Sequence, residues 1–227
     1  MNNVQKVTEI IAQQGMLPLY FNEDENVSIQ VLRALYRAGI KAVEYTSRGD
    51  TALSNFKKMI QVRDSEMPDL LIGIGTIKNL KQAQDYFNAG ADFFISPGFI
   101  TDVALFLKNK SVFYSPGCMT PTEIITAENT GIKFIKLFPG NSLGSNFLKG
   151  IKDIFPNLFF MATGGVDTTN DGLTKWFEAG VCAVGLGSNL ISKQLMNDKE
   201  YTTIESDTRA ILDKIRLIKI SIYGLQI

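Results

Sequence analysis

Short apolar runs recur along this chain, and each is followed by a stretch whose apolar residues have helical spacing. The runs begin about 20 to 30 residues apart, which is the length of a strand plus a crossover helix. They cover residues 17–20, 42–46, 70–74, 92–95, 112–114, 134–138, 158–161 and 182–186. Eight such units close naturally into a (β/α)8 barrel. An open doubly wound sheet is less compatible, because no dinucleotide-binding glycine fingerprint follows the first run.

The repeat therefore predicts an α/β fold, a (β/α)8 TIM barrel that occupies residues 1–227 as a single domain. Helices between the strands are expected at 26–37, 50–62, 79–88, 101–108, 121–129, 143–154 and 168–179. An amphipathic helix over 4–12 is expected before the first strand, with Gln14-Gly15 at its end. A last helix, over roughly 202–219, is expected to pack outside the barrel.

No histidine occurs among the 227 residues, which removes the usual general base and the usual zinc or iron ligand. Cys118 and Cys182 do not have the spacing of a metal site. Proton transfer is therefore expected to fall to carboxylates, lysine, tyrosine or water. We expect no metal and no other cofactor.

Charge patterning excludes several classes of partner. Lys plus Arg and Asp plus Glu are equal at 23 each, so there is no overall basic field for nucleic acid and no polybasic anchor for a membrane. Residues 1–15 place charges among their apolar positions, unlike a signal peptide or a membrane-spanning helix. These features predict a cytoplasmic protein that recognises a small molecule.

Lys136 lies within an apolar and aromatic run in the sixth predicted strand. In a parallel sheet such a strand is buried on both faces. A lysine there pairs with an acid, reaches solvent near the strand end, or loses its proton. The last outcome produces a neutral amine that attacks ketones and forms Schiff bases.

The carboxyl ends of the strands carry the chemistry in barrel enzymes, and the second predicted strand ends in polar residues. Glu44, Thr46 and Arg48 share one face of this strand, because side chains alternate along it. Glu44 is either a counter-ion for a cation in the barrel or a general base, and both roles are compatible with Lys136 as the cation. Arg48 is either a surface residue or a bidentate clamp for a carboxylate.

Other polar residues that follow strands have simpler interpretations. Thr76, Thr120 and Thr163 also suit the capping of turns. The segments Ser96-Pro97-Gly98 and Ser115-Pro116-Gly117 are expected to be structural turns after the fourth and fifth strands.

Glycines follow both the seventh and the eighth predicted strands, at Gly164-Gly165 and at Gly187, and Ser188 is expected to open a helix. In these barrels a phosphate commonly binds there, facing backbone N–H groups and a helix N-terminus. Tight turns with positive φ are the alternative. The presence of glycines in both loops favours the phosphate site.

Taken in order, these motifs resemble the KDPG/KHG aldolase family, whose substrates are 2-dehydro-3-deoxy-phosphogluconate (KDPG) and 4-hydroxy-2-oxoglutarate (KHG). The resemblance spans about residues 15–192. It rests on Glu44-x-Thr-x-Arg48, Gly73-x-Gly-Thr76, Ser96-Pro-Gly98, Phe134-x-Lys136-x-Phe-Pro139, Thr163-Gly-Gly165 and Gly187-Ser188. It implies a metal-free class I aldolase, usually a homotrimer, that reversibly cleaves a 2-keto-4-hydroxy acid to pyruvate and an aldehyde.

The resemblance also implies a role for each matched residue. Lys136 is expected to form the Schiff base and Glu44 to move protons. The residues expected to bind substrate are Arg48, Thr76, Pro97, Phe138 and Thr163, and those expected to bind its phosphate are Gly164, Gly165, Gly187 and Ser188.

Three positions depart from the family's pattern. Ala162 stands where many members have Pro, Gly49 where Thr is common, and Phe21-Asn22 where Arg is frequent. These positions concern the rim of the site, so KDPG, KHG and the C4 epimers stay open as substrates. Two rival functions also remain: a phosphosugar isomerase or epimerase that uses Glu44 without a covalent lysine, and a non-catalytic sensor of sugar-acid phosphates.

Overall fold

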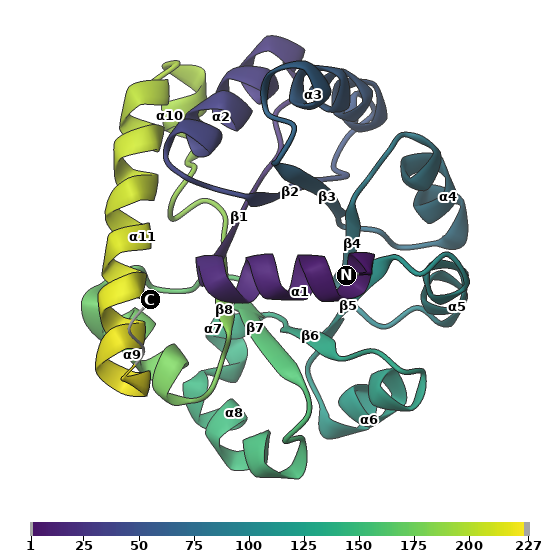
Figure 1. The fold of residues 1–227 in the computed structure, drawn as a ribbon, viewed down its shortest axis with the longest axis vertical. Helices are drawn as coiled ribbons and strands as arrows, with labels where there is room; N and C mark the ends of the chain where they lie inside the picture. The colour runs from purple at the N-terminus through teal and green to yellow at the C-terminus, as the bar shows by residue number, and fades with distance from the viewer. Residues whose placement is uncertain (1, 225–227) are drawn as a thin grey trace.

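The computed structural model describes residues 2–224 and shows a closed barrel of eight parallel strands in the order β1 to β8 (Figure 1). The strands are β1 Met16–Tyr20, β2 Ala42–Thr46, β3 Leu71–Gly75, β4 Phe93–Ser96, β5 Phe113–Cys118, β6 Phe134–Leu137, β7 Phe159–Thr163 and β8 Ala183–Leu186. Each strand pairs in parallel with the next, and β8 pairs with β1. The predicted (β/α)8 barrel is confirmed.

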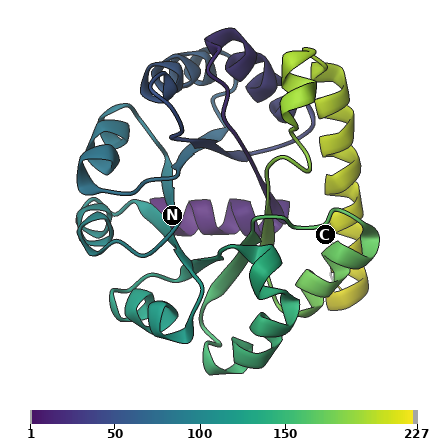
Figure 2. The same cartoon turned by 180° about the vertical axis from the view of Figure 1, so that it is seen from behind.

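Helices surround the barrel on its outside (Figures 1 and 2). They are α1 Asn3–Gln14, α2 Glu25–Arg37, α3 Ala52–Glu66, α4 Leu80–Asn88, α5 Thr101–Asn109, α6 Pro121–Asn129, α7 Gly140–Leu143, α8 Ser145–Ile151, the 3-10 turn η1 Lys152–Ile154, α9 Asn170–Glu178, α10 Lys193–Asn197 and α11 Tyr201–Tyr223. Within residues 2–224, none of these helices is both long and apolar enough to span a membrane.

The helix α1 lies across the amino-terminal mouth of the barrel, in front of the strands in Figure 1 and behind them in Figure 2. It begins after Asn2, whose side chain accepts a hydrogen bond from Gln5 N–H, and it ends at Gly15 with φ 73°. Val7 and Ile11 are fully buried against the apolar lumen of the barrel. The helix predicted over 4–12 is confirmed, and the structure adds that it closes the barrel.

The last helix, α11, packs outside the barrel against α2 and α9, as predicted (Figure 1). It runs past the predicted end at residue 219 because its final turn finds partners. The Tyr223 hydroxyl donates to Phe177 O at 2.7 Å, and Gly224 ends the helix with φ 64°.

Two predictions of local structure between residues 115 and 154 are wrong. Ser115-Pro116-Gly117 is part of β5, because Pro116 pairs with Ser96 of β4 and Gly117 pairs with Lys136 of β6. The helix predicted over 143–154 is divided into α7, α8 and η1, since Gly144 adopts φ 72° between the first two.

The lumen of the barrel has two layers. The lower layer is apolar and contains inward-facing residues such as Ala42, Phe134 and Met161. Each of these residues precedes a polar residue by two positions, so the same alternation turns Glu44, Lys136 and Thr163 into the lumen one layer higher. All three of these polar residues are buried.

Candidate active site

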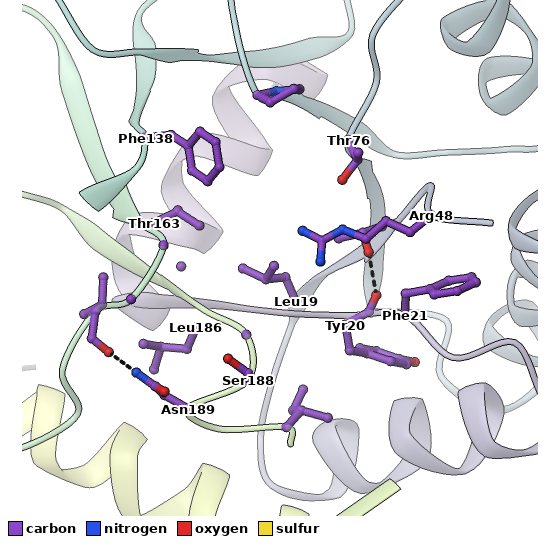
Figure 3. Close-up of a pocket in the computed structure, with 18 of the residues that line it drawn as sticks. Leu19, Tyr20, Phe21, Arg48, Thr76, Phe138, Thr163, Leu186, Ser188 and Asn189 are labelled. Carbon is purple, nitrogen blue, oxygen red and sulfur yellow. Dashed lines mark hydrogen bonds between the residues drawn. The ribbon is translucent and has the colours of Figure 1, made fainter. Parts of the chain in front are cut away.

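A cavity of about 670 Å³ opens at the carboxyl ends of the strands (Figure 3). Loops that follow β1, β2, β3, β4, β6, β7 and β8 contribute to its wall. Every residue predicted to act at the site lines this cavity, with the exception of Glu44, which lies behind the wall. The structure therefore brings the predicted site residues together from across the sequence.

Lys136 reaches the cavity from β6, where its neighbours Ile135 and Leu137 face outward into the core between barrel and helices. Lys136 is only 5% exposed. Its Nζ lies 5.1 Å from the centre of the Phe138 ring, and its nearest acidic oxygen is Glu44 Oε1 at 3.9 Å. Among the described residues, this amine donates no hydrogen bond within ordinary distance.

Glu44 extends from β2 across the top of β3, and glycine makes this possible. A Cβ atom on Gly75 would lie 1.7 Å from Glu44 Oε1. Glu44 is 1% exposed, and its Oε2 has no hydrogen-bond partner in the described part of the chain. A buried carboxylate oxygen without a partner is costly in a purely structural role, which favours a role towards a ligand.

Burial brings the pKa values of Glu44 and Lys136 closer to each other. Burial raises the pKa of Glu44, and the nearby positive charges of Lys136 and Arg48 oppose that rise. Burial lowers the pKa of Lys136; the Glu44 charge opposes this change and the Arg48 charge adds to it. Both shifts favour the neutral forms, so the pair can exchange a proton at modest cost.

Three polar side chains, Arg48, Thr76 and Thr163, line the same cavity as Lys136. Figure 3 shows Arg48 and Thr76 on one side of the cavity, with Phe138 and Thr163 on the other. Thr76 has φ 63°, an uncommon backbone state for a β-branched residue and one that occurs often at functional sites. The Thr163 hydroxyl is buried without a partner among residues 2–224, and Gly185 leaves room for it.

Pro97 lines the cavity from the turn after β4. The Ser96 hydroxyl contacts both Gly98 O and the Tyr114 hydroxyl, at 2.5 and 2.6 Å. These contacts agree with the structural role predicted for this turn. Thr120 is a helix cap, because it accepts from Glu123 N–H at the start of α6, and it does not line the cavity.

The glycine loops after β7 and β8 lie together at one end of the cavity. Gly164 and Gly165 have φ 97° and 64°. Backbone N–H groups of Gly165, Val166, Ser188 and Asn189 donate no hydrogen bond to another described residue. Free N–H groups on adjacent loops form a concave donor surface suited to an anion.

The helix predicted to begin at Ser188 is absent from the described residues at that position. Gly187 O instead accepts from Leu190 and Ile191 N–H, which closes one isolated turn. The next helix, α10, begins at Lys193 after the cap Ser192. The sequence signal failed because a Ser after glycine suits both a turn and a helix start, and the actual cap lies four residues later.

Several residues that line the cavity were not predicted. Phe21 packs against Gly49, where a Cβ atom would lie 3.1 Å from the Phe21 ring, so two departures from the family pattern meet at the rim. The others include Leu19, Glu23, Val166, Asn189, Lys193 and Met196. Glu23, Val166 and Asn189 could have been indicated by their positions shortly after strands 1, 7 and 8, whereas Leu19 lies within β1, and Lys193 and Met196 lie in α10.

The two cysteines lie outside the wall of the cavity. Burial raises the pKa of both thiols to about 12, which disfavours their reactive thiolate forms. Among residues 2–224, no three Cys, Asp or Glu side chains gather in an arrangement that could hold a metal ion.

Comparisons with known proteins agree with this geometry. A family model described as KDPG and KHG aldolase matches residues 7–206. A 2-dehydro-3-deoxy-phosphogluconate aldolase from Pseudoalteromonas atlantica is 31% identical over 163 residues, which are 71% of this chain and 74% of the relative. The KHG/KDPG aldolase of Escherichia coli K12 is 25% identical over 219 residues, which are 96% of this chain and 100% of the relative.

A solved structure adds a chemical parallel. It is a KDPG aldolase from Legionella pneumophila in which pyruvate was captured as a covalent carbinolamine intermediate. It is 26% identical, superposes with a TM-score of 0.82, and is matched over 89% of this chain and 96% of its own.

Proposed function

The chain belongs to the KDPG and KHG aldolase family, and on that premise we propose that it reversibly cleaves KDPG to pyruvate and glyceraldehyde 3-phosphate. As a family member it is a carbon–carbon lyase of the class I aldolase type. KHG, which would give pyruvate and glyoxylate, is proposed as a second substrate. The observation that carries the proposal is the buried Lys136–Glu44 pair, 3.9 Å apart at the cavity.

In the first step, the neutral amine of Lys136 attacks the C2 ketone and a carbinolamine forms. One amine proton moves to the former carbonyl oxygen. The protonated form of Glu44, which burial favours, then gives a proton to the leaving hydroxyl, and water departs. The product is an iminium ion on Lys136 beside an ionised Glu44.

In the second step, Glu44 takes the proton of the C4 hydroxyl. The C3–C4 bond breaks, the aldehyde leaves, and the bonding electrons move into the iminium to give an enamine. The imine nitrogen is thus the electron sink, and no bound cofactor is needed. Glu44 returns its proton to C3, and hydrolysis of the imine releases pyruvate.

The other site residues are proposed to position the substrate. Arg48, Thr76 and Thr163 line the same cavity as the lysine, where they can bind the pyruvyl carboxylate and the reacting oxygens. Pro97 and Phe138 form apolar walls beside them.

The phosphate is proposed to bind at the glycine loops. The residues are Gly164, Gly165, Gly187 and Ser188, and the free N–H groups there support the assignment. Lys193 also lines the cavity and has no ion-pair partner among the described residues, so the wall has a surplus of positive charge.

A homotrimer, a cytoplasmic location and a single-domain organisation stay predictions from the sequence and the resemblance. Analytical ultracentrifugation would test the first of them directly. A monomer that retains full activity would contradict a functional need for the trimer.

Covalent trapping tests the proposed chemistry. Incubation with pyruvate and borohydride should reduce the imine and leave one pyruvyl group on Lys136, as read by peptide mass mapping. Lys133, an exposed lysine three residues earlier, is the internal control and should stay unmodified. Turnover of KDPG without any adduct would favour other chemistry, and neither adduct nor turnover would favour the sensor.

A further inference from the structure

The loop between β7 and α9 begins with an unusual backbone conformation. Gly164 and Gly165 are consecutive residues with positive φ, and neither belongs to a helix or a strand. Glycine adopts this state easily but also leaves it easily, because it has no side chain to restrict it. The shape of this loop must therefore be held by its neighbours.

Two hydrogen bonds from neighbouring segments hold residues 164–166 at the start of this loop, one from each side. Asn141 N–H, from the start of α7, donates to Gly164 O at 2.8 Å. The Asn189 side chain, from the loop after β8, donates through Nδ2 to Val166 O at 2.8 Å (Figure 3). Asn189 is thus a brace between the two loops whose free N–H groups face the same end of the cavity.

The geometry also assigns the orientation of the Asn189 amide. The atom that faces Val166 O must be the NH₂ group, since two carbonyl oxygens would repel each other. An amide NH₂ has two hydrogens, and Val166 O accepts one of them. The second hydrogen has no acceptor among the described residues, and the side chain lines the cavity beside Ser188.

We propose that Asn189 is a positioning and specificity-determining residue for the phosphate end of the substrate. Its first amide hydrogen braces the β7–α9 loop so that the N–H groups of Gly165 and Val166 keep one arrangement. Its second amide hydrogen donates directly to a phosphate oxygen. The inference rests on the proposed function, and it adds a side-chain determinant to a site otherwise formed by backbone and one hydroxyl.

Two substitutions distinguish the loss of the Asn189 hydrogen bonds from the effect of a negative charge at this position. Asn189→Leu has similar volume but removes both donors. Asn189→Asp has the same shape, but its carboxylate cannot donate to Val166 O and repels a phosphate. The control is Gln194→Leu, which removes a nearby exposed amide that bonds Asp198 and does not line the cavity.

The comparison of substrates is the measurement. Asn189→Leu should raise KM for KDPG roughly 10–100-fold, the usual effect of losing a hydrogen bond to a charged group, while kcat changes little. Asn189→Asp should raise it further. The KM for KHG, which has no phosphate, should stay close to wild type in both variants. Gln194→Leu should match wild type with both substrates.

Binding of inorganic phosphate gives a second readout that does not depend on turnover. Phosphate should raise the thermal unfolding temperature of wild type and of Gln194→Leu, but not of Asn189→Asp. Equal loss with KDPG and KHG in a folded Asn189→Leu variant would overturn the proposal, as would unchanged phosphate binding in Asn189→Asp. Absence of the Lys136 adduct in wild type would overturn the proposed function and leave the phosphate-binding test of Asn189 valid.

Discussion

The two layers of the barrel lumen differ although they are built from the same strands. In the lower layer, Phe134 and Met161 pack with α1 in a cluster of apolar side chains. Two residues further along the same strands, Lys136 and Thr163 are buried polar groups beside a cavity. Glycine allows the upper layer to hold polar side chains, since Gly75 and Gly185 make room for Glu44 and Thr163. Close packing stabilises the lower layer of the barrel. In the upper layer, the absence of side chains at Gly75 and Gly185 leaves space for polar groups beside the cavity.

The largest effect is expected from Lys136→Met, which extends the apolar layer upward. Cleavage of KDPG should fall by roughly 10⁴-fold or more, because the variant lacks the buried amine that is proposed to form the imine. The fold should persist, since Glu44 can take up a proton when its cation is removed. Steady-state kinetics with circular dichroism measures both, and Lys133→Met should behave like wild type in each.

Glu44→Gln should reduce cleavage by roughly 10²–10⁴-fold, the usual contribution of a positioned acid or base. The amide keeps the size of the carboxylate but cannot accept a proton. Single-turnover kinetics would show whether imine formation and bond cleavage both slow. Near-normal rates would leave Glu44 as a counter-ion for Lys136 and nothing more.

Met161→Ala tests the opposite layer. It should lower the free energy of unfolding by about 2–5 kcal/mol through lost burial and a residual cavity. The folded variant should keep near-normal turnover, because the Met161 side chain belongs to the apolar layer and does not line the cavity, while its backbone pairing with Lys136 is kept in the variant. Urea unfolding measures the stability of the variant and of wild type. The kcat of each is then compared at urea concentrations well below the unfolding transition. A large loss of kcat with unchanged stability would show that the layers are not separable.

The smallest effect is a shift in pH dependence. Only the neutral amine of Lys136 attacks, so the rate of imine formation should rise with pH as this amine loses its proton. Burial lowers the pKa of Lys136 from 10.5, so the midpoint of this rise should lie below 10.5. Trapping of the imine with cyanoborohydride at a series of pH values measures this midpoint. A midpoint at 10.5 or above would mean that the site does not activate the lysine.

Sequence patterns predicted some features well and others poorly, for reasons that particular residues illustrate. The alternation along β2 placed Glu44 and Arg48 on one face, and in the structure Arg48 lines the cavity while Glu44 lies 3.9 Å from Lys136. Ser115-Pro116-Gly117 was predicted as a turn, yet it continues β5, because pairing with β4 and β6 outweighs the local preference of Pro and Gly. Ser188 was predicted to open a helix, but the cap is Ser192.

The sequence by itself determined the repeated strand and helix units, the choice of Lys136 and Glu44 as candidate catalytic residues, and the glycines that follow strands 7 and 8. These are local properties, because period and residue type are visible within a short window. Only the tertiary structure decided that Lys136 and Glu44 approach to 3.9 Å and that α1 closes the lower mouth. It also decided that Asn189 reaches Val166 O across two loops. Such distances depend on the register of all eight strands around the closed barrel, which no single segment contains.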